Sequence, residues 1–210
     1  MKAIVASLSL ALLLTGCART GELVPGGVYV ERSGCPQVAI PAATGDVTVF
    51  NPVNYTTAGA IDVVAAMTNV RATCTQDATY LVSTASFDVV ASRRDAGPAR
   101  QVVLPFFTVA VQGGTNIAAK RVGAVALDFP AGSMRAQTRG QATVRVARSA
   151  VALPEDVRRE LTRERKAGDP NAAVDPMSDP KIRDAVARAT FEHLIGFQLS
   201  PDQLRYNATR

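Results

Sequence analysis

The sequence predicts a mainly β protein: an Ig-like or related antiparallel β-sandwich followed by two C-terminal helices. Residues 35–150 alternate short apolar runs, rich in valine, threonine and phenylalanine, with turn residues, which is the pattern of a sandwich. After Ser149 the composition changes to charged segments with helical spacing. The chain has 210 residues, of which 47% are hydrophobic and 20% charged. This composition supports one apolar core and excludes both a disordered chain and several large domains.

Residues 1–16 have the pattern of an export signal peptide. Lys2 supplies a positive charge, and an apolar run follows from Ile4 to Leu14. This run is too short to span a bilayer, which needs roughly 20 apolar residues. We therefore expect the segment to direct export and to be removed.

The apolar run ends in Leu14-Thr15-Gly16-Cys17, which is an aliphatic residue, two small residues and a cysteine. This motif resembles the lipobox of bacterial lipoproteins. The resemblance implies cleavage before Cys17, a diacylglyceryl thioether on its sulfur and acylation of the new N-terminus. Two or three such chains anchor a protein stably in a membrane. An ordinary secretory signal with a chance cysteine is the alternative.

Ala18, rather than aspartate, follows the lipobox cysteine. In lipoproteins of this kind the resemblance then implies sorting to the outer membrane, and we expect attachment at its periplasmic face. The body is also similar to poorly characterised envelope lipoproteins of proteobacteria, through Cys35-Pro36, residues 101–112 and residues 196–204. That similarity implies no activity and no functional residues.

The mature chain divides into three parts. Residues 17–34 form the lipidated N-terminus and a tether, since Pro25 is followed there by two glycines. Residues 35–150 form the sandwich domain, and residues 151–210 form a helical extension packed on it.

Two cysteines, Cys35 and Cys74, remain once Cys17 carries lipid. An even number in an exported chain predicts one disulfide. It would close a loop of about 40 residues and stabilise the fold by roughly 3–4 kcal/mol. Two buried free thiols are the alternative. No third or fourth ligand lies at metal spacing, so we expect no metal site.

Six segments of the sandwich domain have the composition of strands. They are residues 46–50, 60–74, 79–92, 101–112, 117–128 and 134–148. In the second segment, alternation places Val70, Ala72 and Cys74 on one face. We expect this face to point inward, as a structural disulfide requires.

Residues 101–112 are the best candidate for a central strand, because both of their faces are apolar. Pro105 complicates this interpretation, since proline is confined to sheet edges, strand starts and bulges. We therefore expect the main strand to start near Phe106.

Two helices are expected near the C-terminus. Residues 154–167 begin with Pro154 and acidic residues and end with basic ones, as the helix dipole favours. A loop with three Asp-Pro pairs follows over residues 168–180. The second helix, about residues 180–195, carries an apolar stripe and is expected to pack on the sandwich. A capping box that begins at Ser200 predicts a last short helical turn.

The single histidine is the obvious candidate for catalysis, but its surroundings argue against that role. His193 falls in the second predicted helix between Phe191 and Leu194, and the chain has no Gly-x-Ser-x-Gly motif. We therefore expect a packed or surface histidine in a non-enzymatic protein, without catalytic residues or cofactors. An enzyme that uses carboxylates such as Asp62 or Asp88 is the alternative.

Three arginines, Arg135, Arg139 and Arg145, share one face of the predicted strand 134–148. They form a candidate surface for anionic lipid, lipopolysaccharide or an acidic protein. The alternative is an ordinary solvated sheet face.

A lipid anchor on a sandwich without a catalytic constellation indicates a non-enzymatic binding or assembly module that holds an envelope protein near the membrane. The alternative is a periplasmic carrier or chaperone for a lipid or another amphiphile. An apolar cavity of roughly 300–1,000 Å³ favours the carrier, whereas a solid core with an exposed apolar or basic patch favours the module. The compartment excludes nucleic acid as a partner.

Overall fold

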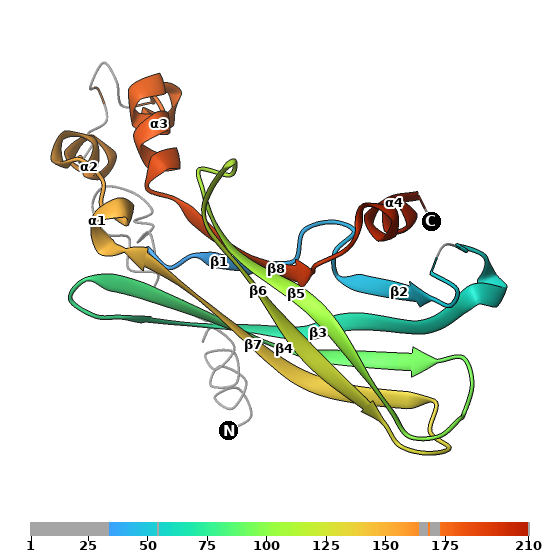
Figure 1. The fold of residues 1–210 in the computed structure, drawn as a ribbon. Coiled ribbons are helices and arrows are strands. Elements are labelled where there is room, and N and C mark those ends of the chain that lie inside the picture. The colour runs from blue at the N-terminus through green and yellow to red at the C-terminus, as the bar shows by residue number, and fades with distance from the viewer. Residues whose placement is uncertain (1–33, 54, 164–167, 169–172, 210) are drawn as a thin grey trace, which may run out of the picture. The chain divides into compact units, whose positions relative to one another are not determined.

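The computed structural model describes residues 34–53, 55–163, 168 and 173–209. The chain divides into two compact units, and every element below lies in the unit that comprises residues 32–162 and 174–210. This unit contains two four-stranded sheets and several short helices (Figure 1). The prediction of a mainly β, sandwich-like fold with helices near the C-terminus is confirmed.

Each sheet combines strands from distant parts of the sequence. Sheet I has the order β1-β8-β5-β6, and sheet II has the order β2-β3-β4-β7. All pairs are antiparallel except β1 with β8. The strands of sheet I are β1 (Gln37–Ala39), β8 (Phe191–Phe197), β5 (Arg100–Gln112) and β6 (Asn116–Phe129). Those of sheet II are β2 (Asp46–Phe50), β3 (Ile61–Gln76), β4 (Tyr80–Arg93) and β7 (Arg135–Ala147).

The helices are short. They are η1 (Ala58–Ala60), α1 (Arg148–Val151), α2 (Glu155–Thr162), η2 (Pro176–Ser178), α3 (Pro180–Arg188) and α4 (Pro201–Thr209). The Asp175, Asp179 and Ser200 side chains cap the N-termini of η2, α3 and α4. The predicted capping box is confirmed, because the Ser200 and Gln203 side chains each accept the other's backbone N–H. α4 then packs on β2, where the Tyr206 ring meets the Phe50 ring edge-on at 5.1 Å.

The second helix is much shorter than predicted. It ends at Arg188, and residues 191–197 form β8 instead, between β1 and β5. The apolar residues of this segment recur at spacings that fit a helical stripe, but Phe191, His193, Ile195 and Phe197 also alternate with period two, and all four are buried. The segment expected to be a helical extension therefore supplies a strand to the sandwich.

The central strand β5 also differs from its predicted bounds. It starts at Arg100 rather than near Phe106 and contains Pro105, which lies opposite Ala124 of β6. Pairing with β8 begins only at Phe106, and Gln198 beyond β8 donates its N–H to the Pro105 carbonyl. Because β8 ends at this point, the proline's missing N–H removes no bond from the centre of the sheet.

A bulge in β3 changes which residues face the core. It lies between Thr68 and Arg71, where Asn69 has a φ of 51°, a left-handed conformation that asparagine tolerates better than most residues. Before the bulge the odd-numbered residues are buried, whereas after it Cys74 lies opposite the buried Ser83 of β4. This shift turns Cys74 inward.

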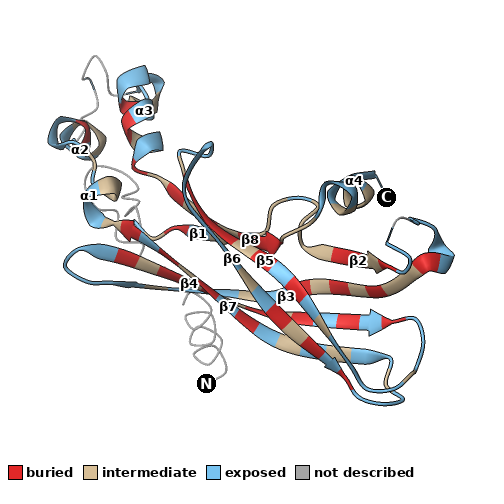
Figure 2. Ribbon diagram, viewed as in Figure 1, coloured by how far each residue is buried: buried red, intermediate tan, exposed pale blue. Residues whose placement is uncertain are grey.

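The centre of the core is a pair of phenylalanines, one from each sheet. The rings of Phe87 in β4 and Phe106 in β5 meet edge-on, with centroids 5.2 Å apart. Each ring lies over a glycine of the neighbouring edge strand: a Cβ at Gly140 would fall 2.4 Å from Phe87, and one at Gly123 would fall 2.7 Å from Phe106. Both positions therefore require glycine. Buried and more exposed residues alternate along the strands around this pair (Figure 2).

Candidate functional site

The histidine lies in the core, within a chain of polar side chains that links the two sheets. His193 of β8 is fully buried; its Nδ1 lies 3.0 Å from the Ser83 hydroxyl of β4, and its Nε2 lies 2.9 Å from the Thr108 hydroxyl of β5. Burial lowers the pKa of His193 to about 4, because a charged imidazole would lose its hydration. The ring is therefore neutral at pH 7, with one nitrogen donating and the other accepting.

This arrangement was missed in the sequence because His193 was assigned to a helix. The distance between Ser83 and His193 is that of a nucleophile and its base. Both residues are, however, almost completely buried, so a substrate cannot reach the hydroxyl in this conformation. The period-two burial of residues 191–197 is the signal that would have placed the ring in the core.

The predicted disulfide is present. Cys35, just before β1, is bonded to Cys74 near the end of β3, with Cα atoms 6.1 Å apart. In the strand registers Cys74 lies opposite Ser83, and β1 pairs with β8 at His193. The disulfide therefore joins the two sheets close to the polar chain through His193.

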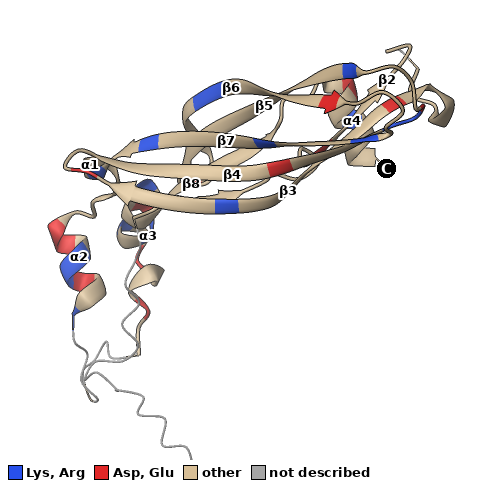
Figure 3. Ribbon diagram, turned by 90° about the horizontal axis from the view of Figure 1, so that it is seen from below, with Lys and Arg blue, Asp and Glu red and all other residues tan. Residues whose placement is uncertain are grey.

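The three arginines of the predicted basic face are all exposed on β7, but not all of their charge is available. Arg139 forms an ion pair with Asp88 of β4 at 3.0 Å. The Asn69 amide, and then Arg139, hold the pKa of Asp88 below its usual value. Arg145 helps to lower the pKa of Asp77, after the larger effects of the Tyr80 and Thr79 N–H groups. Figure 3 shows the basic segments along β7 beside the acidic segment of β4.

A groove lies between the inner face of sheet I and the edge of sheet II, with a volume of about 460 Å³. Its lining residues are Thr108, Ala119 and Arg121 from sheet I, and Thr143, Val144 and Arg145 from sheet II. The groove is open because sheet II ends at β7, which leaves residues 116–121 of β6 exposed. Its lining is mixed, with two arginines and two threonines beside the apolar Ala119 and Val144.

The outer face of sheet I has the opposite character. Leu104 and Phe106 of β5 face the core, so their odd-numbered neighbours face outward. These lie beside β6 residues of the same face, which gives an apolar face made of Val103, Pro105, Phe107, Val122 and Ala124, bordered by Lys120, whose amine lies over the Phe107 ring. Val103 and Val122 are 57% and 59% exposed.

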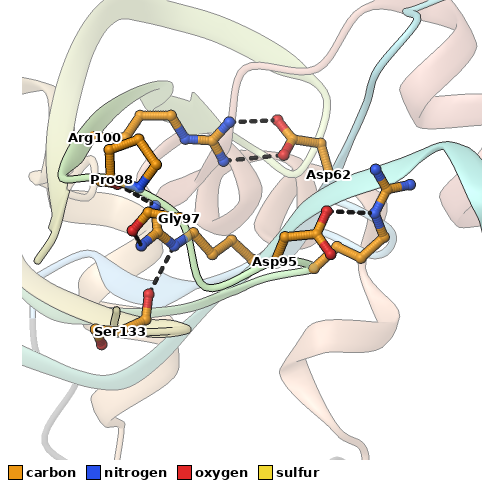
Figure 4. A network of polar contacts seen from close by, with 8 residues as sticks. Asp62, Asp95, Gly97, Pro98, Arg100 and Ser133 are labelled. Carbon is orange, nitrogen blue, oxygen red and sulfur yellow. Dashed lines mark hydrogen bonds and ion pairs between the residues drawn. The ribbon is translucent and has the colours of Figure 1, made fainter. Parts of the chain in front are cut away.

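A buried arginine lies at the end of the sandwich that carries the β4–β5 and β6–β7 loops. Arg93 is only 5% exposed, and its guanidinium donates to the carbonyls of Ser133, Pro98, Gly97 and Pro130 at 2.7–3.1 Å. It also lies over the Phe129 ring, 5.3 Å from its centroid. These contacts join the β4–β5 and β6–β7 loops (Figure 4).

The two carboxylates considered for catalysis are both held in ion pairs. Asp62 accepts two bonds from the Arg100 guanidinium, at 3.0 and 3.1 Å (Figure 4). Asp88 is paired with Arg139, as described above. Within the described ranges, no group of three or more His, Cys, Asp or Glu side chains could hold a metal ion.

The predicted signal peptide, Cys17 and the tether up to residue 33 lie outside the described residues. Among the described helices, none is long and apolar enough to cross a membrane. No protein-family model matches the chain, and no curated protein and no solved structure is significantly similar to it.

Proposed function

We propose that this protein is a lipid-anchored envelope protein that acts as a non-enzymatic binding or assembly module. Its anchor would be Cys17, whose lipobox implies lipidation, sorting to the outer membrane and attachment at the periplasmic face. The Cys35–Cys74 disulfide is compatible with an oxidising compartment. The module would hold an envelope protein close to the membrane.

The exposed apolar face of sheet I is the observation that carries this proposal. Val103, Pro105, Phe107, Val122 and Ala124 are adjacent on one side of β5 and β6. Contiguous apolar surface of this kind is typical of protein interaction sites. The outer face of sheet II is mixed: Thr, Ser, Asp, Gln and Arg side chains of β4 and β7 lie there beside Tyr80, Val82 and Val90 of β4. The outer face of sheet I is thus the more apolar of the two, and it is the face on which we expect a protein partner to bind.

The carrier alternative receives no support from the groove beside β7. A lipid chain favours a continuous apolar lining, whereas this groove mixes Ala119 and Val144 with two arginines and two threonines. The space between the sheets next to it is filled by one continuous cluster of buried side chains.

Site-specific photo-crosslinking in cells tests the partner surface. A photoreactive amino acid at Val122, in the full-length chain, should give a discrete protein adduct. The same residue at Gln141, exposed on the outer face of sheet II, is the matched control and should give none. V103D should reduce the Val122 adduct without changing the circular dichroism spectrum. Identical adducts at the two positions, or none at Val122, would contradict the proposal.

The anchor is tested separately. C17S should abolish metabolic labelling with fatty acid and release the protein from the membrane fraction. A C17S protein that still pellets with membranes would contradict the lipid anchor but leave the partner surface open to its own test.

A further inference from the structure

The groove beside β7 carries a positive charge in an unusual place. Arg121 lies opposite Thr108 in the β5–β6 register, and Thr108 faces the interior. Arg121 therefore projects from the inner face of sheet I, where a sandwich normally places apolar residues. Arg145 lines the same groove from β7.

The Arg121 guanidinium has no ion pair within the part of the chain that the structure describes. The acidic group that interacts with Arg145 is Asp77, which is already bound to the Thr79 and Tyr80 N–H groups. Arg145 alternates with the buried Val144 and Val146, so it lies on the outer face of sheet II and borders the groove at its rim. The groove therefore has one guanidinium group on its inner side and one at its edge. Their planar donors match the oxygens of carboxylate and phosphate groups.

The polar chain through His193 adds a third donor to the groove. If Ser83 donates to Nδ1, the neutral ring donates its Nε2–H to Thr108, and the Thr108 hydroxyl proton is left for an acceptor in the groove. In the opposite direction Nδ1–H donates to Ser83, whose own proton would then point into a buried, apolar interior. Burying a polar group without a partner is costly, so the first direction is favoured.

We propose that this groove binds an oxyanion, a carboxylate or a phosphate group, at Arg121, with the Thr108 hydroxyl as a further donor and Arg145 at the rim. Ala119 and Val144 supply the apolar parts of the lining, which strengthens the electrostatic attraction by excluding water. The groove volume lies within the range of small-molecule sites. This site lies on the inner face of sheet I and does not depend on the apolar outer face.

Titration of the full chain in neutral detergent with inorganic phosphate, and separately with glutarate, tests the site. The side-chain Nε–H resonances of Arg121 and Arg145 should shift and saturate. Loss of one charge-assisted bond weakens binding about tenfold, so we expect that effect from R121Q and a smaller one from R145Q at the rim. R135Q removes the same charge from an exposed position of β7 outside the groove, and should change the affinity less than about twofold.

The threonine is tested by T108V and T108S. T108V should weaken binding several-fold and T108S should retain it, which separates loss of the hydroxyl from loss of the fold. Tighter binding of phosphate would identify a phosphate-bearing ligand, and tighter binding of glutarate an acidic side chain or small acid. The absence of a saturable shift with both probes would overturn the proposal, as would equal weakening by R121Q and R135Q.

Discussion

The two ends of β4 bury a nitrogen-containing side chain in different ways. Near its start, Ser83 contacts the buried His193, and at its end Arg93 is itself buried. The histidine is neutral because burial lowers its pKa, and it is satisfied by two hydroxyl groups. The arginine remains a cation, as guanidinium groups do in proteins, and is satisfied by four backbone carbonyls.

This difference follows from what surrounds each group. His193 lies in the middle of β8, where the backbone carbonyls already accept hydrogen bonds from neighbouring strands. Only side chains remain there as hydrogen-bond partners for the ring. Arg93 lies at a strand end, where two loops present free carbonyls. The buried side chain is therefore charged at Arg93, where loop carbonyls surround it, and neutral at His193, where no free carbonyls are present. The histidine end should respond to acid through His193 and to reductant through the nearby disulfide.

The largest effect is expected at the arginine end. R93M removes the cation and leaves four carbonyls without their donor, so we expect unfolding free energy to fall by about 3–5 kcal/mol. Urea unfolding of the full chain in neutral detergent, followed by circular dichroism, measures it. R94M, at the adjacent and exposed Arg94, should cost less than about 1 kcal/mol. Similar losses in the two variants would mean that the buried contacts are not what stabilises this end.

Removal of the disulfide is the next largest effect. With Cys35 and Cys74 separated by 39 residues, C35S/C74S should lower the unfolding free energy by roughly 3–4 kcal/mol through the greater entropy of the unfolded chain. Dithiothreitol should destabilise the wild type by a similar amount and leave the double variant unchanged. If dithiothreitol also destabilised the double variant, its effect on the wild type could not be assigned to the Cys35–Cys74 disulfide.

A smaller effect is expected from acid. His193 has a pKa of about 4 in the folded protein, below its ordinary value of 6.5, so between these values the unfolded chain binds more protons. The contribution is complete above pH 6.5 and is lost as pH falls toward 4, by up to about 1.4 kcal/mol per pH unit. Carboxylates also titrate in this range, so the comparison is with H193Q, whose stability should depend less steeply on pH. Parallel pH profiles for the two proteins would count against the buried neutral ring.

The smallest effect concerns the exposed ion pair near Arg93. Asp62 and Arg100 are 24% and 38% exposed, so solvent screens their attraction. We expect R100Q to cost less than about 1 kcal/mol even though the pair is bidentate. A loss as large as that of R93M would show that this pair, rather than the buried guanidinium, closes the end of the sandwich.

Local patterns in the sequence predicted much of this fold. Alternation indicated β4 and β7, the capping box at Ser200 located the start of α4, and the even number of remaining cysteines indicated the disulfide. Each of these signals acts within a few residues or depends only on composition.

The remaining features depend on contacts between distant segments. β8 has seven residues, too few to separate a helical stripe from alternation, and it is specified by pairing with β1 and β5. Alternation along their strands places Arg93 and Arg121 on inner faces. This unusual position of an arginine is the sequence pattern that could have indicated the buried guanidinium and the groove. Their partners come from other strands and loops, which a single sequence does not bring together.

The glycines beneath Phe87 and Phe106 also act on how the chain assembles. A slip of two residues between neighbouring strands preserves inside and outside, so hydrophobicity alone does not oppose it. Such a slip of β6 would place Arg121 or Val125 opposite Phe106, and one of β7 would place a threonine or an alanine opposite Phe87. Each of these side chains meets a ring in space that only glycine leaves free. The two Phe–Gly pairs therefore disfavour a shifted register both in the β5–β6 hairpin and in the long-range pairing of β7 with β4.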